Sequence, residues 1–294
     1  MLVIVGFVII FGGVSVGFAM AAGGHGAMNF GAIGGLFHLN EFISLGGMVI
    51  GSCVVMAPMG VLKGVFKQGL GTLKGAPFSK ADYEELFQCM YELFQMGRKG
   101  GMIALEEHVM NPEASALFQK YPKFHGNHHA LEYMADGLKP IVDGRIKPDQ
   151  LEPLMARSLH TMEEEHHGPI LVMTKVADSL PAFGIVAAVL GIIVVMMFKI
   201  GGDTAVVGQG IATALAGTFF GIFGSYCMVG PIATNADFNG HAEMTYMKVI
   251  KASVISFANG LPPLVACEVG RRELSEDVRM GSGDLETLLK SGGG

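Results

Sequence analysis

The chain has 294 residues, of which 50% are hydrophobic and only 16% are charged, and its mean hydropathy is +0.46. Soluble domains of this length carry about 25% charged residues, so the composition favours a protein whose solvent is a lipid bilayer. The net charge of -6 excludes an overall basic field for phosphate neutralisation, and we expect no nucleic-acid partner.

Four apolar stretches are long enough to cross a hydrocarbon layer about 30 Å thick as helices. They cover residues 2–22, 42–62, 181–198 and 206–229. Each contains glycines, which let helix backbones approach closely inside a bilayer. The first stretch lacks the basic start of a secretory signal, so it is expected to remain in the mature protein. The predicted fold is all-α, a polytopic membrane protein with four transmembrane helices and a large helical cytoplasmic region between spans two and three.

The positions of lysine and arginine predict the orientation of these spans. None of the 20 basic residues precedes Lys63, and only Lys199 lies between the third and fourth spans. Basic residues near span ends are retained in the cytoplasm, so both termini and the middle block are expected inside. The loops 23–41 and 199–205 then face outward. The resulting division is 1–62 (spans one and two), 63–178 (cytoplasmic helical region), 179–231 (spans three and four) and 232–294 (cytoplasmic C-terminal helices and tail).

The middle block carries the signals of several folded helices. Ser79 and Asp82 have the spacing of a capping box and open a segment with apolar residues on one helical face. Further helices are expected over residues 101–110 and 128–142, each followed by a turn or a proline breaker. A last helix, over 149–165, runs with little interruption toward the third span.

Beyond the fourth span the chain becomes more polar. The pattern predicts an amphipathic helix over residues 234–259, because its longest uncharged apolar run is too short to span a bilayer. A second helix is expected over residues 264–274. The remaining tail is polar and rich in glycine, which is typical of a mobile segment.

Few residues suggest chemistry. No nucleotide-binding glycine loop, nucleophile elbow or HExxH motif occurs, so no enzymatic activity and no cofactor are expected. The four cysteines are scattered singly, without metal-ligand spacing. A cluster of histidines and glutamates over residues 160–167 could share helix faces around a metal. We favour a solvated charged face instead, because the spacing selects no particular metal.

The third and fourth spans contain no ionisable residue. If the protein moves ions, the ion-binding carboxylate should therefore come from a partner. Thr218 lies well inside the fourth span, where a hydroxyl usually bonds a neighbouring helix. Pro181 and Pro231 flank the two spans and either mark helix boundaries or kink a helix between two conformations. Both interpretations stay open.

Three blocks of sequence, taken in order, resemble the MotA family, the A subunits of bacterial flagellar stators within the MotA/TolQ/ExbB proton channel group. The blocks are DSLPAFGIVAA over residues 178–188, Arg98 with the residues from Gly101 to Asn111-Pro112, and Asn259-Gly260 followed by Pro262-Pro263 and EVGR over residues 268–271. The resemblance implies a proton-driven torque generator in the bacterial inner membrane. It also implies a pentameric ring around a dimer of a MotB-type B subunit, whose transmembrane aspartate binds the ion.

The resemblance also assigns roles by motif position. Arg98 and Glu106 would contact the rotor protein FliG, and Pro181 and Pro231 would couple ion passage to movement of the cytoplasmic region. Ala188 and Thr218 would line the ion pathway. Sodium-driven relatives carry threonine in place of Ala188, so the methyl group here favours protons, H+, as the transported ion.

Three alternatives remain beside a proton-driven stator. An energiser subunit of the ExbB/TolQ type would have three spans and an outward N-terminus. A sodium-driven stator subunit would have to bind sodium without the threonine that sodium-driven relatives carry in place of Ala188. A channel or transporter acting alone is disfavoured by the absence of an intramembrane acid and of an internal repeat.

Overall fold

The computed structural model describes residues 2–23, 27–75 and 77–291. Throughout these residues the regular structure is helical and no strand occurs, which confirms the predicted all-α fold. The chain divides into two compact units. The membrane unit consists of Met1–Gly75 with His166–Phe238, and the globular unit consists of Ala76–Glu165 with Asn239–Gly294.

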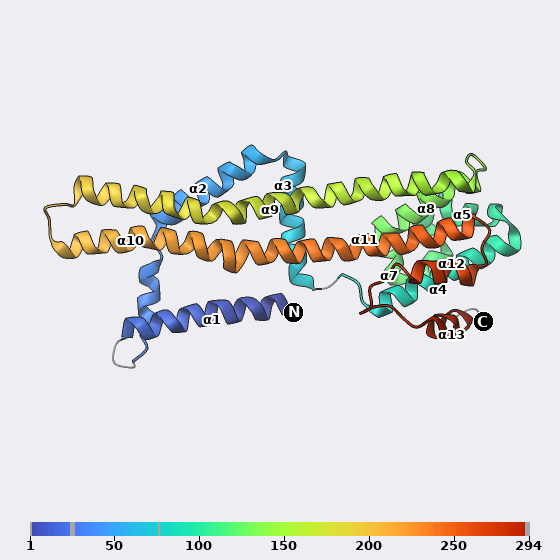
Figure 1. Cartoon of the computed structure of the whole chain (residues 1–294), viewed down its shortest axis with the longest axis horizontal. Helices are drawn as coiled ribbons and strands as arrows, with labels where there is room; N and C mark the ends of the chain where they lie inside the picture. The colour runs from blue at the N-terminus through green and yellow to red at the C-terminus, as the bar shows by residue number, and fades with distance from the viewer. Residues whose placement is uncertain (1, 24–26, 76, 292–294) are drawn as a thin grey trace. The chain divides into compact units, whose positions relative to one another are not determined.

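The membrane unit contains the four helices that are long and apolar enough to cross a bilayer, as predicted. They are α1 (Leu2–Gly23), α2 (Leu39–Met56), the C-terminal part of α9 (Pro148–Phe198) and α10 (Thr204–Phe223). Helices α9 and α10 form an antiparallel hairpin (Figure 1). Short 3-10 segments, η1 (Phe30–Leu36) and η2 (Thr72–Lys74), precede α2 and follow α3 (Met59–Gly71).

The second span differs from the predicted range 42–62. It begins earlier, at Leu39, and ends at Met56, where Ala57 adopts an extended conformation with φ -144° and ψ 146°. Ala57 precedes Pro58, and the proline ring disfavours helical geometry in the residue before it. The 18 residues of α2 still cover about 27 Å. The end of the predicted span belongs instead to α3, which packs its Gly64 against Pro169 of α9.

The third and fourth spans are parts of much longer helices. The predicted helix over 149–165 is the beginning of α9, which runs unbroken for 51 residues. Helix α10 continues through a π-helical turn, η5 (Gly224–Val229), into α11 (Gly230–Ala258). The helix predicted over 234–259 is therefore not separate from the fourth span. Pro181 and Pro231 lie within these helices, so their interpretation as boundaries is wrong.

The globular unit opens with the predicted capping box. The Ser79 backbone N–H donates to Asp82 Oδ2 at 2.7 Å, at the start of α4 (Lys80–Gly100). The expected helix over 101–110 is a 3-10 turn in its first half and α-helical in its second half. The helix over 128–142 has the predicted bounds. The elements in this part are η3 (Met102–Leu105), α5 (Glu106–Met110), η4 (Pro112–Ala114), α6 (Ala116–Gln119), α7 (Pro122–His125) and α8 (His128–Val142).

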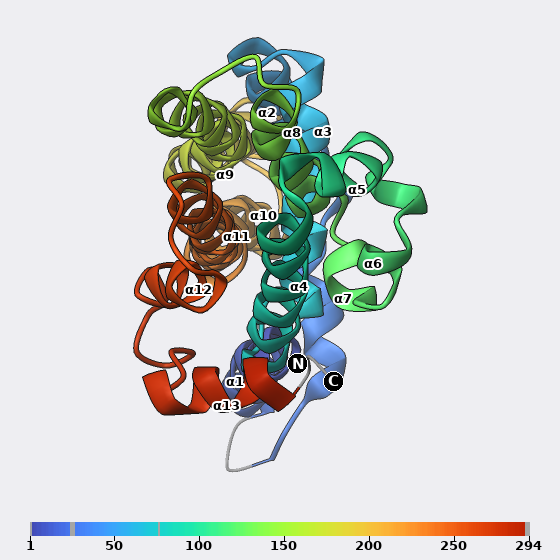
Figure 2. The same ribbon diagram turned by 90° about the vertical axis from the view of Figure 1, so that its right-hand side faces the viewer.

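One contiguous hydrophobic core holds the globular unit together. The apolar face of α4 is fully buried in it, and Phe94 stacks on Phe257 of α11 with ring centroids 4.4 Å apart. Helix α12 (Pro263–Arg271) and helix α13 (Ser282–Ser291) both pack beside α4 (Figure 2). The prediction of a mobile tail is wrong for α13, because Leu285 and Leu289 are only 1% exposed. Their spacing of four residues places both on the face that meets the core.

Candidate functional site

The α9–α10 hairpin is packed so closely that helix backbones touch. A Cβ atom built on Gly184 of α9 would lie 2.8 Å from the carbonyl oxygen of Gly217 on α10. A Cβ atom on Gly221 would lie 2.6 Å from the carbonyl oxygen of Leu180. Neither position has room for a side chain. Glycine at these positions therefore allows α9 and α10 to pack this closely, as small residues commonly do at helix contacts in membranes.

Ala188 and Thr218 lie on the two facing helices of this hairpin. Ala188 is 6% exposed, and Thr218 is half-buried with its Cα 3.2 Å from a Cβ atom built on Gly184. The structure thus brings the two predicted pathway residues to the same hairpin. Ala188 contributes a buried methyl group there, and Thr218 contributes a hydroxyl.

Glu41 is a site residue that the sequence analysis missed. Its side chain comes from the first turn of α2 and is only 7% exposed. Glu41 Oε2 lies 2.6 Å from a Cβ atom built on Gly217, and Oε1 lies 3.5 Å from one built on Gly191. The two glycines therefore form a notch that only the carboxyl group fills. Because Glu41 belongs to a candidate membrane span, the expectation that it lies in an outer loop is wrong.

His38 and Thr213 extend this site along α2 and α10. His38 Nε2 lies 3.1 Å from Thr213 Oγ1, and the Thr213 hydroxyl donates to the carbonyl oxygen of Gln209 at 2.9 Å. With its hydroxyl proton directed to Gln209, Thr213 can only accept from His38 Nε2–H, and in this tautomer His38 Nδ1 carries a lone pair. His38 Nδ1 and Glu41 Oε2 are both buried, and neither has a hydrogen-bond partner in the described residues.

The two predicted hinge prolines differ in their surroundings. Pro181 lies in the uninterrupted part of α9, where its missing N–H leaves the carbonyl of Ala177 without its helical donor. Pro231 lies two residues after the π-helical turn η5 (Gly224–Val229), and such turns are frequent at functional sites. Helix geometry therefore changes just before Pro231, which itself lies in the first turn of α11. A coupling role for either proline stays a prediction.

Arg98 and Glu106 are exposed side chains of the globular unit. Arg98 lies in the last turn of α4, and Glu106 is the first residue of α5. Gly101, with φ +76°, turns the chain between them. A cation at a helix C-terminus and an anion at a helix N-terminus both complement the helix dipole. Both charges are available to a partner protein, and their assignment to the rotor stays a prediction.

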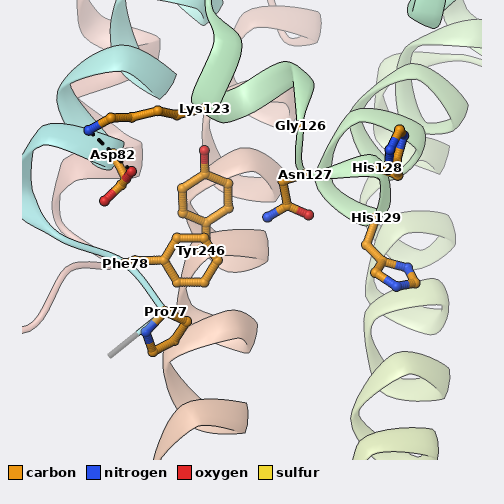
Figure 3. Close-up of a pocket in the computed structure, with 9 residues that line it drawn as sticks. All are labelled: Pro77, Phe78, Asp82, Lys123, Gly126, Asn127, His128, His129 and Tyr246. Carbon is orange, nitrogen blue, oxygen red and sulfur yellow. Dashed lines mark ion pairs between the residues drawn. The ribbon is translucent and has the colours of Figure 1, made fainter. Parts of the chain in front are cut away.

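Two further polar features of the globular unit lie apart from these residues. His160 pairs with Glu164 at 3.5 Å on an exposed face of α9, and the described residues contain no group of three His, Cys, Asp or Glu that could hold a metal. A hollow of about 360 Å³ contains an ion pair of 3.4 Å between Lys123 and Asp82 (Figure 3). Burial disfavours the Asp82 carboxylate, but hydrogen bonds from Ser79 and the ammonium of Lys123 outweigh it and lower the pKa of Asp82. This carboxylate is therefore already satisfied.

Two family models match the chain in succession. The model described as motility protein A N-terminal matches residues 4–101, and the model of the MotA/TolQ/ExbB proton channel family matches residues 126–248. The fold and these matches define a membrane protein of the proton channel class.

Full-length relatives narrow this class. Motility protein A of Salmonella typhimurium (strain LT2) is 32% identical over 291 residues, covering 99% of this chain and 96% of the relative. Motility protein A of Escherichia coli (strain K12) matches with the same identity and coverage. The chemotaxis protein LafT of Vibrio parahaemolyticus is 31% identical over 259 residues, covering 88% of this chain and 90% of the relative. The chain belongs to the motility protein A family.

Solved structures share the fold. The structure of C. jejuni MotAB matches with a TM-score of 0.75 at 21% identity, covering 95% of this chain and 98% of that chain. The flagellar MotAB stator complex of Bacillus subtilis matches with a TM-score of 0.71 at 21% identity, covering 97% of both chains. These matches support the four-span helical architecture.

Proposed function

We propose that this chain is the A subunit of a flagellar stator, in which proton flow across the bacterial inner membrane produces torque on the rotor. The observation that carries this proposal is the similarity to motility protein A over 99% of the chain. The chain works as an ion-translocating motor subunit rather than as an enzyme. Both termini and the globular unit face the cytoplasm, as the distribution of lysine and arginine predicts.

The partner is a MotB-type B subunit. Similar chains occur in complexes named MotAB, and the third and fourth spans of this chain contain no ionisable residue. An aspartate of the B subunit supplies the ion-binding group against the α9–α10 hairpin, and five copies of the A subunit surround a dimer of the B subunit. Ala188 and Thr218 line the pathway, and the methyl group of Ala188 favours protons over sodium.

Pro181 and Pro231 transmit the ion-dependent change along α9 and α11. Both helices are continuous from the candidate spans into the globular unit, which supports direct mechanical coupling. Arg98 and Glu106 contact the rotor protein FliG. Their exposure and their opposite charges support electrostatic recognition of a charged partner surface.

A flux measurement tests this proposal. The chain is purified alone and together with the B subunit encoded in the same genome, and each preparation is placed in liposomes with a trapped pH-sensitive dye. A potassium gradient with valinomycin drives proton entry. We expect proton flux only with both subunits, and none when the transmembrane aspartate of the B subunit is replaced by asparagine. Equal flux from this chain alone would refute the two-subunit pathway.

The membrane topology separates a stator from an energiser of the ExbB/TolQ type. Reporter domains are fused to the η1 segment and, in a second construction, to the C-terminus. A stator subunit places η1 outside and the C-terminus inside, with four spans. An outward N-terminus and three spans would favour the energiser.

A further inference from the structure

Glu41 combines burial, depth and the absence of a partner. The carboxyl group is 7% exposed, and its Oε2 atom has no hydrogen-bond donor among the described residues. It fills a notch between Gly191 of α9 and Gly217 of α10. At about 1.5 Å per helical residue, Gly217 lies about 20 Å from Thr204 along α10, and Gly191 lies about 10 Å from Phe198 along α9. The carboxyl group therefore lies about 10–20 Å from the turn of the hairpin along α9 and α10, between apolar segments of both helices.

Few charges can compensate Glu41. The segments 181–198 of α9 and 204–223 of α10 contain no Asp, Glu, Lys, Arg or His. Lys199 lies at the turn of the hairpin, with Nζ 3.5 Å from a Cβ atom built on Gly210. Gly210 is two turns, about 10 Å, away from Gly217 along α10. The turn also carries Asp203, which caps α10 by accepting the backbone N–H of Ala205. An ionised Glu41 would be poorly solvated here, so its neutral, protonated form is favoured.

His38 supplies a route for that proton. It lies one turn before Glu41, and residues three positions apart share a helix face. Because Thr213 accepts the Nε2–H of this tautomer, the buried and unpartnered Nδ1 atom is the ring nitrogen that can exchange a proton with Glu41. A proton on Nδ1 makes the ring an imidazolium. Transfer of that proton to the Glu41 carboxylate restores the neutral ring and gives the neutral acid, so charge and protons balance.

We propose that Glu41 is a proton-binding group that this chain itself contributes to the ion pathway, exchanging its proton with His38, whose ring Thr213 orients. The inference rests on the proposed function, because it places Glu41 in series with the acid of the partner. The pathway then contains acids from both subunits. The A subunit does not only surround a proton carried by its neighbour; it holds a proton of its own between α2 and the α9–α10 hairpin.

Substitutions can separate proton exchange from packing. Glu41→Gln keeps the shape and the hydrogen-bonding capacity of the side chain but cannot release a proton. Glu41→Asp keeps an acid, and Ser52→Ala is a control on the same helix, three turns away, where the hydroxyl bonds its own backbone. Each full-length variant is expressed in cells that lack the native copy. Its assembly is checked by co-purification with the B subunit.

Rotation speed at low load is then measured across external pH. We expect Glu41→Gln to assemble but to rotate at least about tenfold more slowly, because loss of a positioned acid-base group typically costs about 10²-fold or more. Glu41→Asp should restore proton-dependent rotation with a displaced pH profile, and Ser52→Ala should match the native chain. Native speed and pH profile in Glu41→Gln would overturn the proposal.

An infrared titration detects the protonated Glu41 carboxyl group without an assembled motor. It therefore tests the proton-binding role of Glu41 separately from the proposed stator function. The difference spectrum between the native chain and Glu41→Gln, recorded in liposomes, should contain the carbonyl band of one protonated carboxyl group that shifts in D₂O. Absence of this band would overturn the inference even if the motor turns. If the band is present and no variant, nor the native chain, supports rotation, the proposed function fails and the proton-binding site stands.

Discussion

The close contact of α9 and α10 predicts a large difference between two glycine-to-alanine substitutions in one helix. A Cβ atom at Gly221 would lie 2.6 Å from the carbonyl oxygen of Leu180 and 2.8 Å from the Cα of Gly184. Carbon and carbonyl oxygen normally approach to about 3.3 Å, so the helices must separate locally by roughly 0.7 Å. A Cβ atom at Gly208, by contrast, meets no atom within 4 Å.

Both substitutions gain the same helix propensity, about 1 kcal/mol, so the difference between them isolates the clash. Overpacking of a tight interface costs about 1–3 kcal/mol. We therefore expect Gly221→Ala to be about 1–3 kcal/mol less stable than Gly208→Ala. The assay is reversible unfolding of the purified chain in mixed micelles with increasing SDS, followed by helical circular dichroism. Equal stability of the two variants would refute the backbone contact.

Three further predictions concern the globular unit. Leu289→Ala should lower the free energy of unfolding by about 2–5 kcal/mol, because the side chain is 1% exposed, and a protease should then cleave at the C-terminus faster. Two hydrogen bonds of 2.7 Å from Arg271 lower the pKa of Glu268. These bonds therefore stabilise the folded protein fully above about pH 4.3, the usual pKa of glutamate, and the stabilisation is lost as the pH falls through the lowered pKa. Glu268→Gln should flatten this acid limb of a plot of melting temperature against pH. Arg98→Glu should abolish swimming without changing the melting temperature, because the side chain is exposed; Glu106→Lys should behave alike, and normal swimming of both would remove the proposed rotor contact.

The sequence correctly predicts those helices and caps whose signal lies within a few turns of the chain. Four apolar stretches of the length that the hydrocarbon layer requires are four helices in the structure, and Ser79 and Asp82 form the predicted capping box. Two errors also had local signals. Ala57-Pro58 marks the end of α2 within the predicted second span, and Leu285 and Leu289 have helical spacing in the tail. Hydropathy averaged over a long window conceals both features.

The buried carboxyl group could not be found in this way. Glu41 stands at the edge of an apolar stretch, and only the helix start at Leu39 decides whether it belongs to the loop or to the span. Its notch is made by Gly191 and Gly217, which are more than a hundred residues away in sequence. The π-helical turn before Pro231 is likewise a property of the long helix in its packed state. Such features depend on tertiary contacts that no residue pattern records.

The pathway residues also divide into those that a sequence motif identifies and one that only tertiary contacts reveal. Ala188 and Thr218 were chosen by resemblance, and the structure adds that both lie on the glycine-packed hairpin. Glu41 has no such motif, but it is a titratable group that is 7% exposed and whose Oε2 atom has no hydrogen-bond partner in the described residues. A site search in related chains should therefore begin with buried carboxyl groups that face paired glycines.

Rotation of tethered cells shows whether proton entry drives the motor that contains this chain. The native copy is deleted, the chain is restored from a plasmid, and rotation is recorded in sodium-free medium while an uncoupler gradually collapses the proton gradient. We expect rotation without sodium, at a speed that falls in proportion to the proton-motive force, and no rotation once that force is lost. Rotation that requires sodium, or that continues after the proton gradient has collapsed, would show that protons do not drive this motor.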